Sequence, residues 1–331
     1  MMKSNHPEVK FGKTGVLLVN LGTPDSTSWL DIRKYLKEFL SDRRVIEVNP
    51  IIWQIILNIF ILTFRPSKTA KAYKEIWLEK ENMSPLRYFT IMQTKKLLDK
   101  IGNKNLIVDY AMRYGNPSIQ EKINKLSKAG CERLIVLPLY PQYAAATTAT
   151  VCDEVYRVLM KMRWQPSLQI VPHYESEPLY IEALVNSLKL KISKLSWKPD
   201  LVLASYHGIP QKYFDKGDPY HCYCQKTSRL ISEKFKDIEI KTTFQSRFGP
   251  EAWLKPYTDK TLETLPTEGK KNVLVICPGF ASDCVETLEE ISIQGKESFL
   301  NSGGENFDTV PCLNDNDDHI NLLEQLTKSA L

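Results

Sequence analysis

Short apolar runs that alternate with amphipathic stretches constrain the fold of this chain more than any other feature of its sequence. Five such runs are rich in Val, Ile and Leu, and they cover residues 15–20, 106–112, 133–139, 201–205 and 272–277. Uninterrupted apolar runs of this length are typical of strands that are buried on both faces. Strands that alternate with helices form parallel sheets covered by helices. The pattern therefore predicts the α/β class.

The length of the chain and the spacing of these runs predict two lobes. A chain of 331 residues is long for one domain and suits two α/β units. A further strand-like stretch, residues 167–172, begins the second half. We therefore predict a first lobe over residues 12–165, a second over 166–304, and a last segment, 305–331, that packs back on the first lobe.

Composition argues against several classes of function. The net charge of +5 is small and spread along the chain, so we expect no nucleic-acid partner. The seven cysteines show no pattern of a disulfide framework, and residues 1–13 are polar, so we expect a reduced, cytoplasmic protein without a signal peptide. Cys222 and Cys224 lie beside His221, but no second pair follows nearby. We interpret them as free thiols rather than as half of a metal site.

Residues 51–64 form the most apolar stretch of the chain, although they are fewer than the roughly 20 residues that span a bilayer. On a helix, Gln54 and Asn58 would share one narrow stripe with Arg65, and Lys68 follows. Such a helix is either a buried core helix or a lip that lies in the membrane interface with its basic residues toward the headgroups. The flanking charge favours the lip.

A histidine stands at the end of one predicted strand. Residues 201–205 run directly toward His207, and Gly208 then ends the strand. Ligands of open α/β sheets bind beyond the carboxyl ends of the strands, where a neutral imidazole can bind a metal or accept a proton. Residues 272–277 likewise precede an acidic helix at 282–290. The two strand ends predict a site for a divalent metal or for proton transfer, although a lone His is more often hydrogen-bonded in a core.

Two further strand ends supply candidates for substrate binding. Arg113 follows the strand at 106–112 and could bind a substrate carboxylate, but a surface ion pair explains it equally well. Trp253 comes after a Gly-Pro turn, where it could stack on a flat ligand or belong to the core. The turn at Gly22 lacks the glycine spacing of a dinucleotide site, so we expect no dinucleotide.

Eight motifs follow one another along the chain and together resemble the ferrochelatase family, in its bacterial type. They are VNLGTP (19–24), MRY (112–114), LYPQY (139–143), SYHGIP (205–210), KGDPY (216–220), FQSR (244–247), GPEAW (249–253) and FASDCVETL (280–288). Each motif is weak alone, but the set is very specific and covers nearly the whole chain. The resemblance implies two similar Rossmann-like lobes with parallel sheets and an active-site cleft between them. It also implies a reaction in which ferrous iron enters protoporphyrin IX to give protohaem and two protons are released.

The resemblance implies roles for individual residues. His207 would be the active-site histidine and Glu286 the carboxylate across the cleft, and both would bind the metal transiently. Asp283 matches a further catalytic position. On a helix, Asp283, Glu286 and Glu290 would share one face as a ladder for protons or iron, although acids suit the start of any helix. Iron is a substrate here, and no tightly bound cofactor is expected. The positions implied to bind the substrate are Leu21, Arg113, Tyr114, Tyr143, Trp253 and Phe280.

The chain departs from the family's pattern at three places. Where the acidic ladder of the family often continues, this chain has Gln294, which puts a long acidic relay in doubt. Animal-type members hold an iron–sulfur cluster on Cys residues of a C-terminal extension and of the loop after the YPQY motif. Here that loop begins with three Ala, residues 144–146, and no Cys follows Cys312, so we expect no cluster. The apolar residues 51–64 resemble the membrane-facing region of protoporphyrin-using members, which favours protoporphyrin over coproporphyrin and predicts peripheral attachment to the cytoplasmic membrane.

Two other classes of protein compete with this interpretation. A chelatase that inserts cobalt or nickel into a sirohydrochlorin-type ring would share the fold and a His. Its substrate carries many carboxylates and would require more basic residues in the cleft and no apolar lip. A non-catalytic tetrapyrrole-binding protein would have no need of the pair His207 and Glu286. A homodimer is a further candidate assembly.

Overall fold

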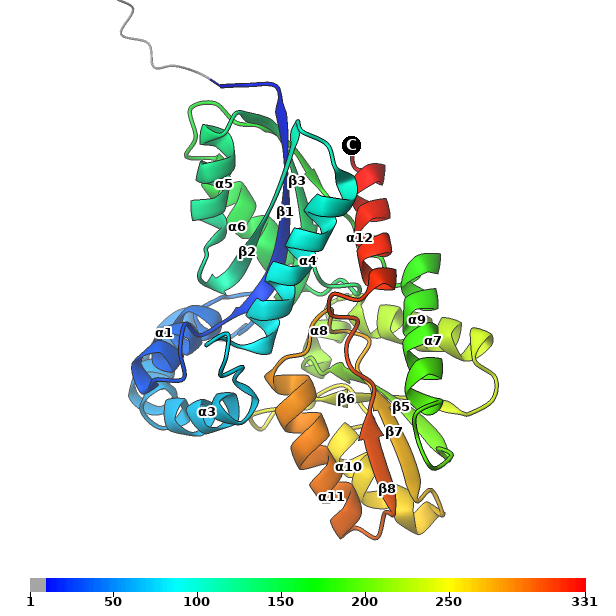
Figure 1. Cartoon of the computed structure of the whole chain (residues 1–331). Coiled ribbons are helices and arrows are strands. Elements are labelled where there is room, and N and C mark those ends of the chain that lie inside the picture. Colours follow the sequence, from blue (N-terminus) through cyan, green and yellow to red (C-terminus); the bar gives the residue numbers. More distant parts are fainter. Residues whose placement is uncertain (1–9) are drawn as a thin grey trace, which may run out of the picture.

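Two parallel sheets organise residues 10–331, the part of the chain that the computed structural model describes. The strand order is β2-β1-β3-β4 in the first sheet and β6-β5-β7-β8 in the second (Figure 1). The two orders are the same pattern, so the predicted α/β class with two similar lobes is confirmed. The strands are β1 (Lys13–Thr23), β2 (Leu106–Gly115), β3 (Cys131–Pro138), β4 (Ser167–Ile170), β5 (Leu201–His207), β6 (Ile240–Gln245), β7 (Asn272–Ile276) and β8 (Asn306–Thr309).

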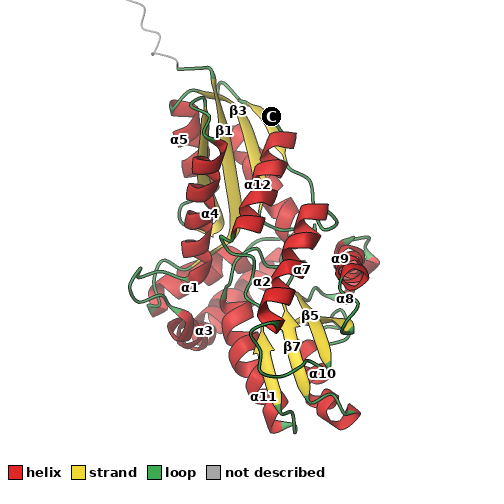
Figure 2. Cartoon of the chain, turned by 45° about the vertical axis from the view of Figure 1, so that its right-hand side comes forward, coloured by secondary structure: helices red, strands yellow, loops and turns green. Residues whose placement is uncertain are grey.

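Helices cover the faces of both sheets (Figure 2). The α-helices are α1 (Trp29–Leu40), α2 (Pro50–Ile56), α3 (Leu62–Ile76), α4 (Pro85–Ile101), α5 (Ile119–Lys128), α6 (Thr150–Leu159), α7 (Pro178–Ile192), α8 (Gln211–Asp215), α9 (Tyr220–Lys234), α10 (Thr258–Thr264), α11 (Lys296–Asn301) and α12 (Asp317–Ser329). A 3₁₀ turn, η3 (Leu265–Glu268), follows α10. Wider π-helical turns form η1 (Leu57–Ile61), η2 (Ala145–Ala149) and η4 (Glu286–Gly295).

Alternation along β1 shows why its central residues are apolar. Leu17 and Val19 belong to one core, whereas Val16 and Leu18 belong to another core on the opposite face of the sheet. All four side chains are completely buried. Successive side chains of a strand point to opposite faces, so the central residues of a strand that is covered on both sides are apolar at successive positions.

Two short strands correct the predicted lobe boundaries. β4 lies in the range assigned to the second lobe, but it pairs with β3 and completes the first sheet. β8 lies in the segment expected to pack on the first lobe, but it pairs with β7 and completes the second sheet. Both are four-residue edge strands, and their few half-buried side chains do not specify a partner sheet. α12 follows β8 and packs against both α4 and α7 (Figure 1).

The apolar segment at 51–64 is exposed over most of its length. Ile51, Ile55 and Phe64 are 76%, 54% and 73% exposed, whereas Leu57 and Leu62 are fully buried in the core that also includes α1. The alternative of a buried core helix is therefore wrong for most of this segment. Among the described residues, one continuous helical stretch, Pro50–Ile76, is long and apolar enough to cross a membrane, and 17% of its most apolar window is buried.

Candidate active site

A cavity of about 680 Å³ opens between the two lobes at the carboxyl ends of their strands. Its volume lies in the usual range for sites of small molecules and cofactors. Elements of both lobes line it, including β1, α1 and α3 of the first lobe and the ends of β5 and β6 of the second. Of the predicted site residues, those that line this cavity are Leu21, His207, Trp253, Phe280 and Glu286.

His207 is the last residue of β5, and its ring has a defined hydrogen bond. The ring atom Nδ1 lies 2.6 Å from the carbonyl oxygen of Gly208. Because a carbonyl only accepts, Nδ1 carries the proton, and in the neutral ring Nε2 keeps its lone pair. A Cβ atom on Gly208 would lie 3.0 Å from the carbonyl oxygen of Gln245 and 3.1 Å from the Trp253 ring. A glycine therefore allows the chain to turn closely behind His207.

Three carboxylates line the cavity from η4: Glu286, Glu289 and Glu290. The sequence predicts an α-helix here, but the segment is a π-helix, in which each N–H bonds five residues back and the turn is wider. π-Helical turns occur frequently at functional sites because the wider turn redirects side chains. Gln294, at which the acidic ladder was expected to stop, lines the same cavity.

Asp283 does not share the face of Glu286 and Glu290, so the expected three-membered ladder is wrong. It precedes η4 and is 7% exposed. Its carboxylate accepts hydrogen bonds from Asn314 Nδ2 at 2.6 Å and from Thr287 Oγ1 at 3.0 Å, and the backbone N–H of Cys312 lies at 3.3 Å. These contacts turn the side chain away from the cavity and tie the start of η4 to the segment before α12.

Several hydrogen bonds fix the carboxylate of Glu290, on η4, in one position. It accepts from the Ser246 N–H at 2.7 Å, from Ser246 Oγ at 2.5 Å and from Gln245 Nε2 at 3.4 Å. Burial raises the pKa of Glu290, while the bonds from Ser246 and the charge of His207 lower the pKa and the charge of Glu286 raises it. Sequence reasoning included Glu290 only in the ladder and missed Ser246 and Gln245. The signal was the FQSR motif, which places both residues at the end of β6.

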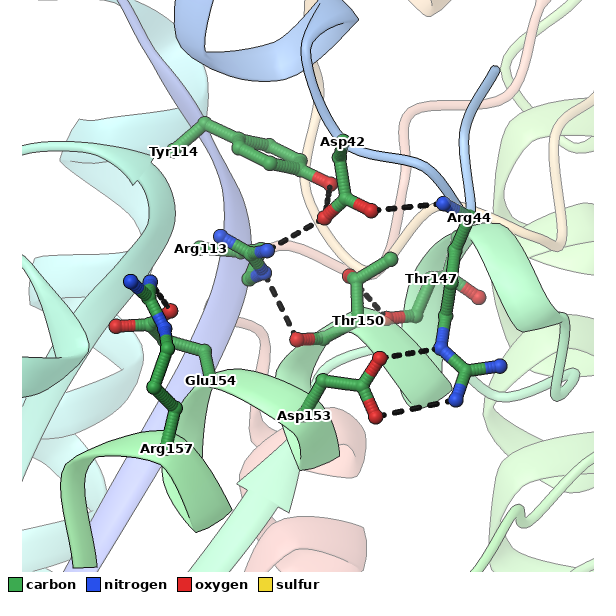
Figure 3. Close-up of polar contacts among 9 residues, drawn as sticks. All are labelled: Asp42, Arg44, Arg113, Tyr114, Thr147, Thr150, Asp153, Glu154 and Arg157. Carbon is green, nitrogen blue, oxygen red and sulfur yellow. Dashed lines mark hydrogen bonds and ion pairs between the residues drawn. The ribbon is translucent and has the colours of Figure 1, made fainter. Parts of the chain in front are cut away.

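Arg113 and Tyr114 lie outside the cavity lining, in a polar network shown in Figure 3. The Arg113 guanidinium lies 2.5 Å from Asp42 Oδ2 and donates to the Thr150 carbonyl at 2.8 Å. The Tyr114 hydroxyl donates to the same Asp42 oxygen at 2.9 Å. The prediction that Arg113 binds a substrate carboxylate is therefore not met in this structure, because Asp42 already neutralises its charge. Tyr143 also lies outside the lining.

The lining of the cavity is largely apolar, with basic residues as well as the carboxylates of η4 among its polar members. Aromatic side chains on the wall include Tyr35, Phe39, Trp253 and Phe280. The basic lining residues are Arg65, Lys68, Lys71 and Arg247. The Arg65 guanidinium lies 5.3 Å from the centre of the Phe248 ring. Within residues 10–331 Arg65 has no carboxylate within ion-pair distance, and burial lowers its pKa.

No group of three or more His, Cys, Asp and Glu side chains in the described part of the chain is arranged to hold a metal ion. All seven cysteines are free thiols. Cys222 is exposed and Cys224 is fully buried, so the two face different surroundings on α9.

Solved structures of other proteins share this fold. SirB from Bacillus subtilis with Fe³⁺ has a TM-score of 0.61 and 10% sequence identity, over 96% of this chain and 95% of that one. The sirohydrochlorin chelatase SirB from Bacillus subtilis subspecies spizizenii in complex with cobalt has a TM-score of 0.57 and 10% identity over the same shares. At these identities the likeness shows the fold alone.

Sequence comparisons are more specific. The family model described as Ferrochelatase matches residues 13–331. A ferrochelatase of Allorhizobium ampelinum is 54% identical over 100% of this chain and 97% of its own length. That of Rhizobium meliloti is 54% identical over 99% of this chain and 98% of its own length. The chain with the two-lobed fold and the cavity between its strand ends therefore belongs to the ferrochelatase family.

Proposed function

We propose that this chain inserts ferrous iron into protoporphyrin IX to give protohaem, with release of two protons. The observation that carries the proposal is the cavity itself. It places one imidazole, His207, and the carboxylates of η4 inside a largely apolar wall. A flat apolar macrocycle fits such a wall, and the chemistry at its centre requires a base and weak oxygen and nitrogen ligands for the metal.

The base is assigned to His207. Each pyrrole N–H must lose its proton while the nitrogen keeps the electron pair that then binds iron. Because Nδ1 of His207 donates to the Gly208 carbonyl, Nε2 is the ring atom free to accept a proton or to bind Fe²⁺. Glu286 supplies an oxygen ligand from η4, on another wall of the same cavity. Nitrogen and oxygen ligands of this kind bind ferrous iron without the tight hold of a thiolate set.

The lining favours protoporphyrin over more acidic tetrapyrroles. Protoporphyrin carries fewer carboxylates than coproporphyrin or sirohydrochlorin. Three basic residues of the lining, Arg65, Lys68 and Lys71, stand together on α3, whereas Arg247 is already paired with Asp259 at 2.7 Å. A ring whose propionates gather on one side can pair with these three cations, whereas carboxylates all around a ring would meet the apolar aromatic wall.

The helical stretch Pro50–Ile76, which ends in α3, supports a peripheral attachment to the cytoplasmic membrane. Ile51, Ile55 and Ile59 are each more than half exposed, and they lead directly into the basic part of α3. An amphipathic surface of this kind inserts apolar side chains among lipids and places cations near the headgroups. Substrate that is dissolved in the membrane would then enter the cavity from its apolar side.

One assay tests the activity. Purified protein is given ferrous or zinc ion with protoporphyrin, coproporphyrin or sirohydrochlorin, and metal insertion is followed by absorbance and fluorescence. We expect protoporphyrin to be the preferred substrate, and His207→Ala and Glu286→Gln to lose roughly 10²–10⁴-fold in turnover while porphyrin still binds. His173→Ala, outside the cavity lining, is the matched control. Faster turnover of another ring, or near-normal turnover in His207→Ala, would refute the proposal.

A second assay tests the attachment. The triple variant with Ile51, Ile55 and Ile59 changed to Gln should stay folded and lose binding to vesicles of phosphatidylethanolamine and phosphatidylglycerol. Leu62 is left intact because it is fully buried. The matched control changes Leu30 and Leu190, which are 71% and 58% exposed on other helices, to Gln. Equal vesicle binding by both variants would contradict the assignment.

A further inference from the structure

The hydrogen bonds of Glu290 come from two consecutive residues at the end of β6. Ser246 supplies both its backbone N–H, at 2.7 Å, and its hydroxyl, at 2.5 Å, and each bonds a different oxygen of the carboxylate. Gln245 adds its side-chain amide at 3.4 Å, and the same amide nitrogen donates to the backbone carbonyl of Glu286 at 2.8 Å. The end of β6 thus holds the first turn of η4 by one backbone N–H and by the side chains of Gln245 and Ser246.

The backbone of Ser246 is in an unusual conformation. Its φ is +66°, in the left-handed region that residues other than glycine rarely adopt. Residues held in this region without a glycine are concentrated at functional sites. Here the conformation directs both donors of one residue at one carboxylate, which an extended continuation of β6 would not do.

A buried chain of polar groups sets the orientation of Gln245. Its oxygen Oε1 accepts from Ser205 Oγ at 2.7 Å, and Ser205 Oγ is 2.9 Å from Thr258 Oγ1. The amide nitrogen must therefore face η4. Gln245 also pairs with His207 in the register of β5 and β6, so the group that holds Glu290 is built on the residue beside the active-site histidine.

We propose that Ser246 is a positioning residue, which fixes the Glu290 carboxylate in the cavity that also contains His207, so that its negative charge stabilises the positive charge that builds up there as iron enters and the pyrrole protons leave. The proposal rests on the proposed function. Ser246 acts through Glu290, and it need not touch the substrate. A negative charge in the same cavity favours the positive charges of the reaction, and a carboxylate held by fixed donors provides that charge without reorganisation.

A double-mutant cycle tests this role. Ser246→Gly suits the left-handed backbone and keeps the N–H donor, so it removes only the hydroxyl. We expect kcat for metal insertion to fall about tenfold, in line with the loss of one hydrogen bond to a charged group, with KM for porphyrin and for ferrous iron unchanged. In a Glu290→Ala background the same change should have no further effect, because residues that act as one unit are not additive. Asn82→Gly, at another left-handed position (φ +50°) outside the cavity lining, is the matched control and should retain full activity.

Three results would overturn the proposal. The first is that Ser246→Gly lowers kcat equally in the wild type and in the Glu290→Ala background. The second is that it changes only KM for porphyrin, which would mean that Ser246 contacts the substrate. The third comes from crystal structures of wild type and Ser246→Gly, in which we expect the Glu290 carboxylate to leave its single position; an unmoved carboxylate contradicts the role even without an activity assay. Absence of metal insertion in the wild type would refute the proposed function instead, and the crystal structures would still decide the positioning of Glu290.

Discussion

His319, on α12, is 1% exposed, and its Nδ1 lies 2.6 Å from the carbonyl oxygen of Asn314. The same carbonyl accepts from Gln93 of α4 at 2.8 Å, and the Asn314 side chain holds Asp283 at the start of η4. Burial lowers the pKa of His319 from 6.5 to about 4, although the bond to Asn314 partly opposes this. His319 therefore stays neutral in the folded protein under conditions in which the unfolded chain takes up a proton.

The sign of the effect follows from this order of pKa values. A group whose pKa is lower in the folded state contributes stability above its unfolded pKa, and that contribution is lost as pH falls through the folded pKa. Each pKa unit is worth about 1.4 kcal/mol. From about pH 7.5 to about pH 5 the contribution should fall by about 2 kcal/mol, and the whole difference of about 3 kcal/mol is reached below the folded pKa.

His319→Asn tests this reasoning, because asparagine is neutral at every pH and keeps an N–H donor at the position of Nδ1. Urea unfolding of wild type and variant is measured at about pH 7.5 and about pH 5, and the two changes in unfolding free energy are compared. Other groups titrate equally in both proteins, so the wild type should lose about 2 kcal/mol more than the variant on acidification. Identical pH dependence in the two proteins would refute the reasoning.

Three further predictions concern stability and the thiols. Arg113→Met should lower the unfolding free energy by about 3 kcal/mol, because it leaves Asp42 without its partner. KM for porphyrin should not change. A raised KM at unchanged stability would show instead that Arg113 binds the substrate. Leu62→Ala should lower the unfolding free energy by about 2–5 kcal/mol. Phe64→Ala, at a 73% exposed position, should change it by less than about 0.5 kcal/mol. Denaturant unfolding measures both changes. Anaerobically purified protein should lack stoichiometric iron and sulfide, and replacing Cys222 with Ser and Cys224 with Ala should leave metal insertion unchanged.

The long central strands, and the histidine at the end of one of them, could be predicted because their signals are local. β1 and β5 are buried on both faces, so each contains a run of apolar residues, 16–19 and 201–204, and His207 stands at the end of β5. The edge strands β4 and β8 have only four residues each. Their sheet is decided by contacts with distant strands, which no local pattern contains.

The side-chain partners of the site were less predictable for the same reason. Asp42 and Arg113 are 71 positions apart, and nothing near Arg113 in the sequence indicates that its charge is already paired. The π-helical form of η4 uses the same residues that favour an α-helix, so the direction of Asp283 depends on its bonds to Asn314 and Cys312 rather than on helical spacing.

The position of α12 also has a consequence for how the protein is made. Its Leu322 belongs to the core of the second lobe, and its Ile320 and Leu323 belong to a core of the first. α12 follows every strand of both sheets along the chain, so a ribosome releases it after all of them. Until then each lobe presents an uncovered apolar surface to the other. The contacts that α12 makes with both lobes can therefore form only after the rest of the two sheets has been synthesised.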